Sequence, residues 1–164
     1  IRNRLLDSVP PSFDYMLMVD LDDVFVEPPT KEAFESCFDL KTWDVMTANG
    51  RHFYYDIWAL RVPGRIDYNC WQRYHELTLL HQVPKQQATY QAIECHKEFM
   101  ASLTQVIPVD SAYNIGILCK VSAIRPCCRF SSGSGGKPIC EHVPFQSCLR
   151  SHGARILFNP KFYL

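Results

Sequence analysis

Several features that assign proteins to broad classes are absent from this sequence. No apolar run approaches the ~18 residues of a membrane-spanning helix, and residues 1–4 lack the apolar core of a secretory signal. The 17 basic and 17 acidic residues cancel, and no block of Lys and Arg is dense enough to follow a phosphate backbone. We therefore expect no transmembrane segment and no nucleic-acid partner.

Paired cysteine knuckles are also missing, although the chain has eight cysteines. Cys127-Cys128 and Cys140-x-His142 come closest, but neither has the C-x₂₋₄-C spacing that is typical of structural zinc. Most of the cysteines stand among apolar neighbours, as small buried residues do. The sequence therefore predicts no structural zinc, and it leaves the disulfide or free state of the cysteines open.

What is present indicates one α/β domain over residues 1–164, which is long enough to bury a core. Apolar runs predict strands at 15–19, 44–48, 53–60, 106–108, 115–118 and 155–158. Helical spacing and capping residues predict helices at 30–38, from 67 onward, at 86–103 and at 141–152. We expect the helix that begins at Asp67 to pack Trp71, Tyr74 and Leu77 into the core.

The clearest candidate site follows the first predicted strand. Residues 15–19 form an apolar run that ends in Asp20, Asp22 and Asp23. Such a run predicts a buried strand, whose end delivers Asp20 and Asp22 to the edge of a sheet, where α/β proteins bind ligands. Two carboxylates one residue apart repel each other unless a cation lies between them, and oxygen ligands suit Mg²⁺ or Mn²⁺. The stretch thus predicts a divalent-metal site, and a polar turn is the alternative.

Three motifs in this order resemble a known family. They are Asp20-Leu21-Asp22, residues 54–61 and residues 140–145. With them the chain resembles nucleotide-sugar glycosyltransferases of the GT-A type, most closely the small glycosyltransferase domains of large algal viruses and of microbial polysaccharide pathways. The resemblance runs from about residue 2 to the end of the chain. It implies a GT-A-like, Rossmann-related α/β fold with a mixed sheet flanked by helices.

The resemblance also implies an activity, which is hexosyltransferase-like transfer from a UDP- or GDP-sugar donor to a glycan or glycoprotein acceptor. In such enzymes the D-x-D motif holds Mn²⁺ or Mg²⁺ against the donor's diphosphate. This role falls on Asp20, near the ribose and the metal, and on Asp22 as a direct ligand. The metal offsets the negative charge left on the diphosphate when the anomeric bond breaks.

Further roles fall on residues of the other two motifs. Glu141 is the candidate for a catalytic carboxylate beneath the sugar or acceptor, and His142 for an auxiliary metal or phosphate contact. Asp56 interrupts an apolar aromatic run, and we assign it as a second catalytic residue in contact with sugar or acceptor, and Arg61 to binding of sugar or acceptor. The alternatives are a helix-start acid for Glu141, a plain polar helix residue for His142, and a structural ion pair between Asp56 and Arg61.

Three more residues are candidates for binding substrate. Asp23 follows the D-x-D motif directly. Asn114 and Gly116 lie where similar enzymes bring a small-residue segment near the donor sugar, although Tyr113-Asn114-Ile115-Gly116 departs from the family's paired glycines.

The chain also departs from the family at its amino terminus. GT-A domains recognise the base of the donor with a β-α-β half that precedes the D-x-D motif, whereas only nineteen residues precede Asp20. Residues 2–6 resemble the end of that half's last helix. We therefore expect a domain truncated at its N-terminus, in which residues 15–19 form an exposed edge and donor binding is weak.

Two other functions compete with glycosyl transfer. A haloacid-dehalogenase-like, Mg²⁺-dependent phosphatase also places D-x-D after an apolar strand, but it needs a later carboxylate pair. After Glu76 the only acids are Glu94, Glu98, Asp110 and Glu141, none of them adjacent. The other competitor is a degenerate, non-catalytic fragment that binds sugar nucleotides. The compartment stays open between the cytoplasm and the Golgi lumen.

Overall fold

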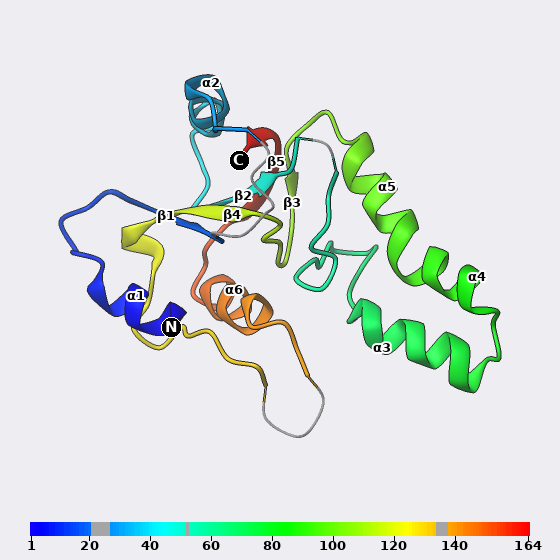
Figure 1. Ribbon diagram of the computed structural model, residues 1–164. Helices are drawn as coiled ribbons and strands as arrows, with labels where there is room; N and C mark the ends of the chain where they lie inside the picture. The colour runs from blue at the N-terminus through cyan, green and yellow to red at the C-terminus, as the bar shows by residue number, and fades with distance from the viewer. Residues whose placement is uncertain (21–26, 52, 134–137) are drawn as a thin grey trace.

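A mixed five-stranded sheet organises the chain, and the computed structural model describes residues 1–20, 27–51, 53–133 and 138–164. The strands are β1 (Tyr15–Val19), β2 (Val45–Asn49), β3 (Ile107–Pro108), β4 (Gly116–Lys120) and β5 (Ile156–Tyr163). They lie in the order β1-β4-β2-β5-β3 (Figure 1). Only β2 and β5 pair in parallel; the other neighbours are antiparallel.

Helices flank this sheet. They are α1 (Arg2–Ser8), α2 (Lys31–Glu35), α3 (Cys70–His75), α4 (Lys85–Thr89), α5 (Cys95–Ser102) and α6 (His142–Ser151). Short 3₁₀ segments lie at Ser36–Phe38 and Val121–Ala123, and π-helical segments at Glu76–Leu80 and Tyr90–Glu94. Figure 1 shows α1 and α6 on one side of the sheet and α2 on the other. The segment from α3 to α5 projects away from the sheet, with α3 in one arm and α4 and α5 in the other (Figure 1), and we call these the projecting helices.

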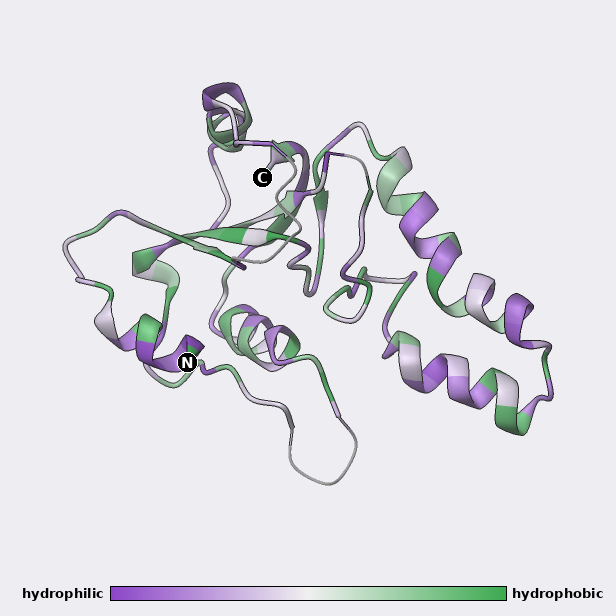
Figure 2. Cartoon of the chain, viewed as in Figure 1, coloured by the Kyte–Doolittle hydropathy of each residue, from purple (hydrophilic) through white to green (hydrophobic). Residues whose placement is uncertain are grey.

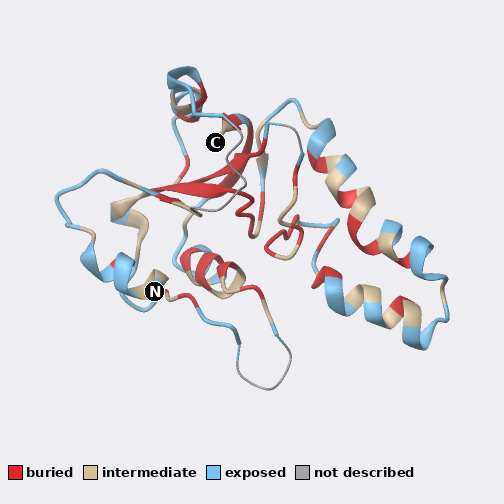
Figure 3. Ribbon diagram, in the orientation of Figure 1, coloured by how far each residue is buried: buried red, intermediate tan, exposed pale blue. Residues whose placement is uncertain are grey.

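Alternating side chains of the central strands build two hydrophobic clusters, one on each face. In β2, Val45 belongs to the larger cluster, and Met46 and Ala48 to the smaller one. In β4 the same alternation separates Ile117 from Leu118. Because successive side chains of a strand point to opposite faces, one apolar run serves both clusters. Burial is therefore concentrated in the middle of the sheet (Figure 3).

Most of the predicted elements are confirmed. Strands lie at 15–19, 45–49, 107–108, 116–120 and 156–163, and the predicted 86–103 helix is present as α4 and α5 joined by a π-helical segment. Thr30 caps α2 by accepting a hydrogen bond from the Ala33 amide at 3.2 Å. Gly153 follows α6 with φ of +88°, the left-handed conformation that glycine adopts easily.

The strand predicted at 53–60 is wrong. Residues 53–60 instead make an irregular loop and a turn. The backbone amides of Tyr55 and Asp56 both donate to the side-chain oxygen of Asn114, at 2.9 and 3.4 Å. The Ala59 amide donates to the Asp56 carboxylate at 3.1 Å. Because side chains satisfy these amides, no neighbouring strand is needed.

The exposed edge expected for residues 15–19 is confirmed, because β1 lies at an edge of the sheet, whereas the burial predicted from the apolar run alone is wrong. Among the described residues β1 pairs with β4 alone, and of its five residues only Met18 is buried. Tyr15 and Leu17 remain 40% and 42% exposed. The apolar run thus forms a strand of the sheet (Figure 2), but the exposed Leu17 is apolar as well. An unpaired apolar edge is the feature that promotes association between chains.

The helix expected from Asp67 begins at Cys70, and Trp71 lies on its exposed side. Asn69 caps α3 by accepting from the Trp71 and Gln72 amides, and Leu77 is buried as predicted. Trp71 is half exposed rather than packed in the core. Among the described helices, none is both long and apolar enough to cross a membrane.

The cysteines divide between core and surface. Cys37, Cys70, Cys119 and Cys140 are free and buried, in agreement with the expected role. Cys128 and Cys148 form a disulfide, and Cys127 is exposed.

Candidate functional site

One arginine joins two of the predicted carboxylates. Asp20 follows the last residue of β1, and Glu141 immediately precedes α6. Arg2, on α1, donates to the Asp20 carboxylate with one guanidinium nitrogen and to the Glu141 carboxylate with the other, each at 2.6 Å. All three side chains are about two-thirds buried, so solvent screens these pairs only in part. Two carboxylates far apart in sequence thus share a single cation.

A stacked pair of rings, Tyr113 and His142, lies next to the cluster of Arg2, Asp20 and Glu141. The Tyr113 hydroxyl donates to the Asp20 carboxylate at 3.3 Å. Its ring stacks on the ring of His142, with centroids 3.6 Å apart. Burial, with a smaller effect from the positive charge of Arg2, lowers the pKa of His142 to about 3. The imidazole is therefore neutral at physiological pH, the form in which histidine binds metals, and its Nδ1 is buried without a partner among the described residues.

Asp56 lies close enough to the other two acids to respond to their charge. The pKa of Asp56 is raised to about 6, chiefly by burial; the hydrogen bond from the Ala59 amide lowers it, and the charges of Asp20 and Glu141 add smaller upward effects. Asn114 holds the backbone of this segment through its side-chain oxygen and has φ of +58°. A carboxyl group with a pKa near 6 gives and takes protons readily near neutral pH.

Two other predicted residues have structural contacts. Arg61 is buried and donates to the carbonyl oxygens of Trp58 and Leu60, at 3.1 and 2.6 Å; among the described contacts it forms no ion pair with Asp56. Gly116 faces β1, and a Cβ atom there would lie 2.7 Å from the Met18 carbonyl oxygen. Glycine is therefore needed for β1 and β4 to approach. Asp22 and Asp23 lie outside the described residues.

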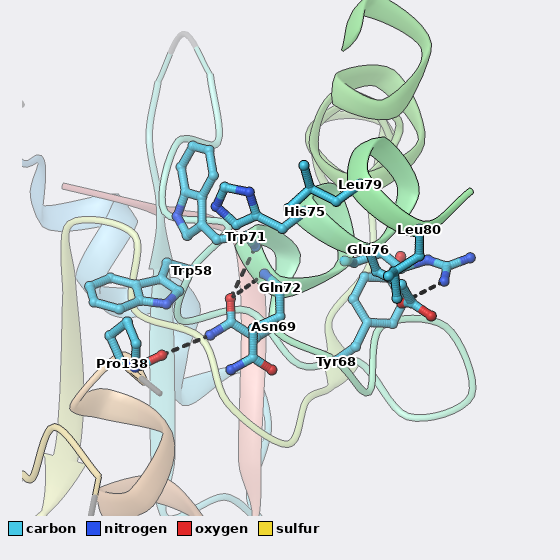
Figure 4. A pocket seen from close by; sticks show the side chains of 11 residues that line it. Trp58, Tyr68, Asn69, Trp71, Gln72, His75, Glu76, Leu79, Leu80 and Pro138 are labelled. Carbon is cyan, nitrogen blue, oxygen red and sulfur yellow. Dashed lines mark hydrogen bonds and ion pairs between the residues drawn. The ribbon is translucent and has the colours of Figure 1, made fainter. Parts of the chain in front are cut away.

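A groove runs beside Asp56. Asp56, Trp58, Trp71 and Lys97 are among the residues that line a cavity of about 490 Å³ between the 55–58 loop and the projecting helices. Trp58 and Trp71 also border a larger cavity of about 850 Å³, which continues along α3 (Figure 4). The Asn69 side chain donates to the Pro138 carbonyl oxygen at 3.2 Å and so joins the start of α3 to the far wall of this cavity.

Arg2 and Tyr113 were not predicted as members of this site. Arg2 is separated from Glu141 by 139 positions, so no local pattern could have paired them. Tyr113 directly precedes Asn114, and an aromatic residue there has many ordinary explanations. Both residues join the site because α1 and the 111–115 segment converge on the end of β1.

Comparisons of the chain with known protein families, curated proteins and solved structures give no match. The fold by itself defines an α/β protein with a mixed open sheet flanked by helices.

Proposed function

We propose that this protein is a metal-dependent glycosyltransferase that moves a sugar from a UDP- or GDP-sugar to a glycan or glycoprotein acceptor. The observation that carries the proposal is the bridge that Arg2 makes between Asp20 and Glu141, two acids from separate parts of the sequence, with Asp56 near enough for both charges to raise its pKa. Glycosyl transfer needs such a set, because charge of both signs develops as the anomeric bond breaks.

The residues fit a divalent cation. The guanidinium of Arg2 already acts as a cation between the carboxylates of Asp20 and Glu141, and these oxygens are the ligands that Mn²⁺ and Mg²⁺ prefer. Asp20 and, from the sequence, Asp22 would hold the metal, with neutral His142 nearby. When bound, the metal supplies Lewis-acid stabilisation to the departing diphosphate.

The other groups have roles that follow from their surroundings. Asp56, which is among the residues that line the smaller cavity, takes the proton from the acceptor hydroxyl as it attacks. Glu141 supplies negative charge beside the sugar as the ring becomes positive. Trp58 and Trp71 present aromatic surface along the larger cavity, where the apolar face of an acceptor sugar can lie.

The phosphatase alternative finds less support in the described acids. A second Mg²⁺-binding pair would have to come from the later part of the chain, but Asp110 pairs with Arg150 and Glu94 with Lys97. Glu98 accepts a hydrogen bond from Tyr90 on the projecting helices. Among the described acids after Glu76, Glu141 alone pairs with the Arg2 guanidinium, which also pairs with Asp20.

A donor-hydrolysis screen tests the proposal. The natural full-length protein is incubated with UDP- and GDP-sugars in Mn²⁺, in Mg²⁺ and in a chelator, and the release of UDP or GDP is measured. We expect release that depends on the metal and that the chelator abolishes. Donor binding without release would support the non-catalytic alternative, and hydrolysis of a simple aryl phosphate instead would support the phosphatase.

The role of Arg2 leads to a separate prediction. Since Mn²⁺ must compete with the guanidinium for Asp20, we expect Arg2→Met to bind Mn²⁺ about tenfold more tightly, the equivalent of one charged hydrogen bond. Arg4→Met, at an exposed position of the same helix, is the matched control and should leave the affinity unchanged. Calorimetry with Mn²⁺ measures both. Equal or weaker binding by Arg2→Met would show that Asp20 and the metal do not meet.

A further inference from the structure

A second group of metal-ligating side chains lies at the opposite end of α6 from Glu141. Cys127, Cys128, Cys148 and His152 each bring one ligand atom to within 4.8 Å of all the others. The set comes from two segments, because Cys127 and Cys128 lie in the loop before residue 130 and the other two lie near the end of α6. Three thiols and one imidazole are a ligand set of structural zinc.

The helix places two of these ligands on one face. Cys148 and His152 are four residues apart, which brings their side chains together at the end of α6. The His152 Nδ1 lies 4.0 Å from the Cys148 sulfur, and its Nε2 lies 3.8 Å from the sulfur of Cys127. Zinc bonds of ~2.3 Å to sulfur and ~2.0 Å to nitrogen in a tetrahedron separate the ligand atoms by ~3.5–3.8 Å. The separation of Cys127 and His152 already has this size.

The histidine is also held in the orientation that a metal needs. His152 Nδ1 lies 2.9 Å from the backbone carbonyl oxygen of Cys148, a distance at which Nδ1–H donates to that oxygen. This tautomer leaves the lone pair on Nε2, which faces the sulfur of Cys127. A hydrogen bond from the second ring nitrogen to a carbonyl is the usual support of a metal-ligating histidine.

In the structure Cys128 and Cys148 are joined by a disulfide, so two of the four sulfurs are oxidised. We propose that this cluster is a redox-controlled zinc site, closed by the disulfide when oxidised and by Zn²⁺ when reduced. A dithiol reductant supplies two electrons and two protons to the Cys128–Cys148 bond and becomes a cyclic disulfide itself. The three thiols then bind Zn²⁺ together with His152 Nε2 and release three protons.

Either state ties the same two segments together. The disulfide joins residues 20 positions apart, and the connecting stretch includes Glu141 and His142. The zinc would restore this link after reduction, when the chain would otherwise lose it. The cluster therefore keeps the end of α6 joined to the loop before residue 130 in both oxidising and reducing surroundings.

Cobalt binding tests the proposal, because Co²⁺ in a tetrahedral thiolate site has intense visible bands and a thiolate-to-metal charge-transfer band. The protein is reduced with a phosphine, freed of reductant and titrated with Co²⁺ and then Zn²⁺. We expect one Co²⁺ per chain with these bands, displacement by Zn²⁺, and no such spectrum from the oxidised protein.

Two variants identify the ligands. Cys127→Ser and His152→Ala retain the Cys128–Cys148 disulfide, so their fold is verified by circular dichroism before reduction. Each should weaken Zn²⁺ binding at least ~100-fold. Cys95→Ser and His75→Ala, whose residues lie on the projecting helices, are the matched controls and should bind like the wild type. The proposal is overturned if the reduced wild type lacks the charge-transfer band or if both ligand variants retain its affinity.

Discussion

Asp20→Asn is expected to lower metal-dependent donor hydrolysis about 1000-fold, a loss of several kcal/mol of transition-state stabilisation. Asparagine keeps the shape of the side chain but removes the charge that would hold the metal. The substitution should leave the backbone in place, because the amide of residue 20 donates to the Ile115 carbonyl oxygen and this hydrogen bond does not involve the side chain. Initial rates at saturating Mn²⁺ give the measurement.

The matched control for this substitution is Asp14→Asn. Asp14 is an exposed acid just before β1, and the change removes the same charge near the same strand. It should leave the rate within twofold of the wild type, a difference of about 0.4 kcal/mol. Asp22→Asn should abolish Mn²⁺ binding in calorimetry. If Asp20→Asn retains the wild-type rate and Mn²⁺ affinity, Asp20 has no part in a metal site.

Asp56 should give the activity a pH dependence of its own. Its pKa is raised to about 6 by burial and by the nearby acids, and a base works only when it is deprotonated. We therefore expect kcat to rise tenfold per pH unit below about 6 and to level off above it. Asp56→Asn should lower kcat by a factor of ~10²–10⁴ and remove this limb of the profile.

The contribution of Asp56 to the free energy of unfolding should fall over the pH range in which kcat rises. This difference separates an effect on catalysis from an effect on folding. An acid whose pKa is raised in the folded state binds more protons there, so its contribution to stability falls as the pH rises from 3.8 to about 6. The neutral asparagine can still accept from the Ala59 amide. Asp56→Asn should thus unfold at the same or higher temperature at pH 8. If Asp56→Asn unfolds at a lower temperature than the wild type at pH 8, its loss of activity follows from unfolding and the catalytic role is refuted. Asp67→Asn, at an exposed position, is the control.

The sequence determined the local elements because their causes are local. The apolar run at 15–19 has strand length, Thr30 caps α2 through a nearby amide, and Gly153 supplies the left-handed conformation after α6. Asp20 follows its strand for the same reason. These features depend on residues within a few positions of each other, so they could be predicted from the chain alone.

Tertiary structure decided which elements meet. The apolar composition of residues 15–19 does not distinguish a central strand from an edge strand; the edge was expected from the family resemblance, and in the described residues β1 pairs with β4 alone. The 53–60 run has the composition of a strand, but the amides of Tyr55 and Asp56 donate to the side chain of Asn114, which is distant in sequence. Local preference cannot anticipate a hydrogen-bond partner nearly sixty residues away.

The two sites show the same division. Asp20 and Glu141 were candidates from the sequence, and the guanidinium of Arg2 that pairs with both comes from α1. The cysteine spacing predicted no zinc site, yet the loop before residue 130 brings Cys127 and Cys128 against the end of α6. The sequence by itself thus determined which residues have the chemistry and which elements carry them. Only the packing of distant segments decided their partners, because contact energies depend on proximity in space and not on separation along the chain.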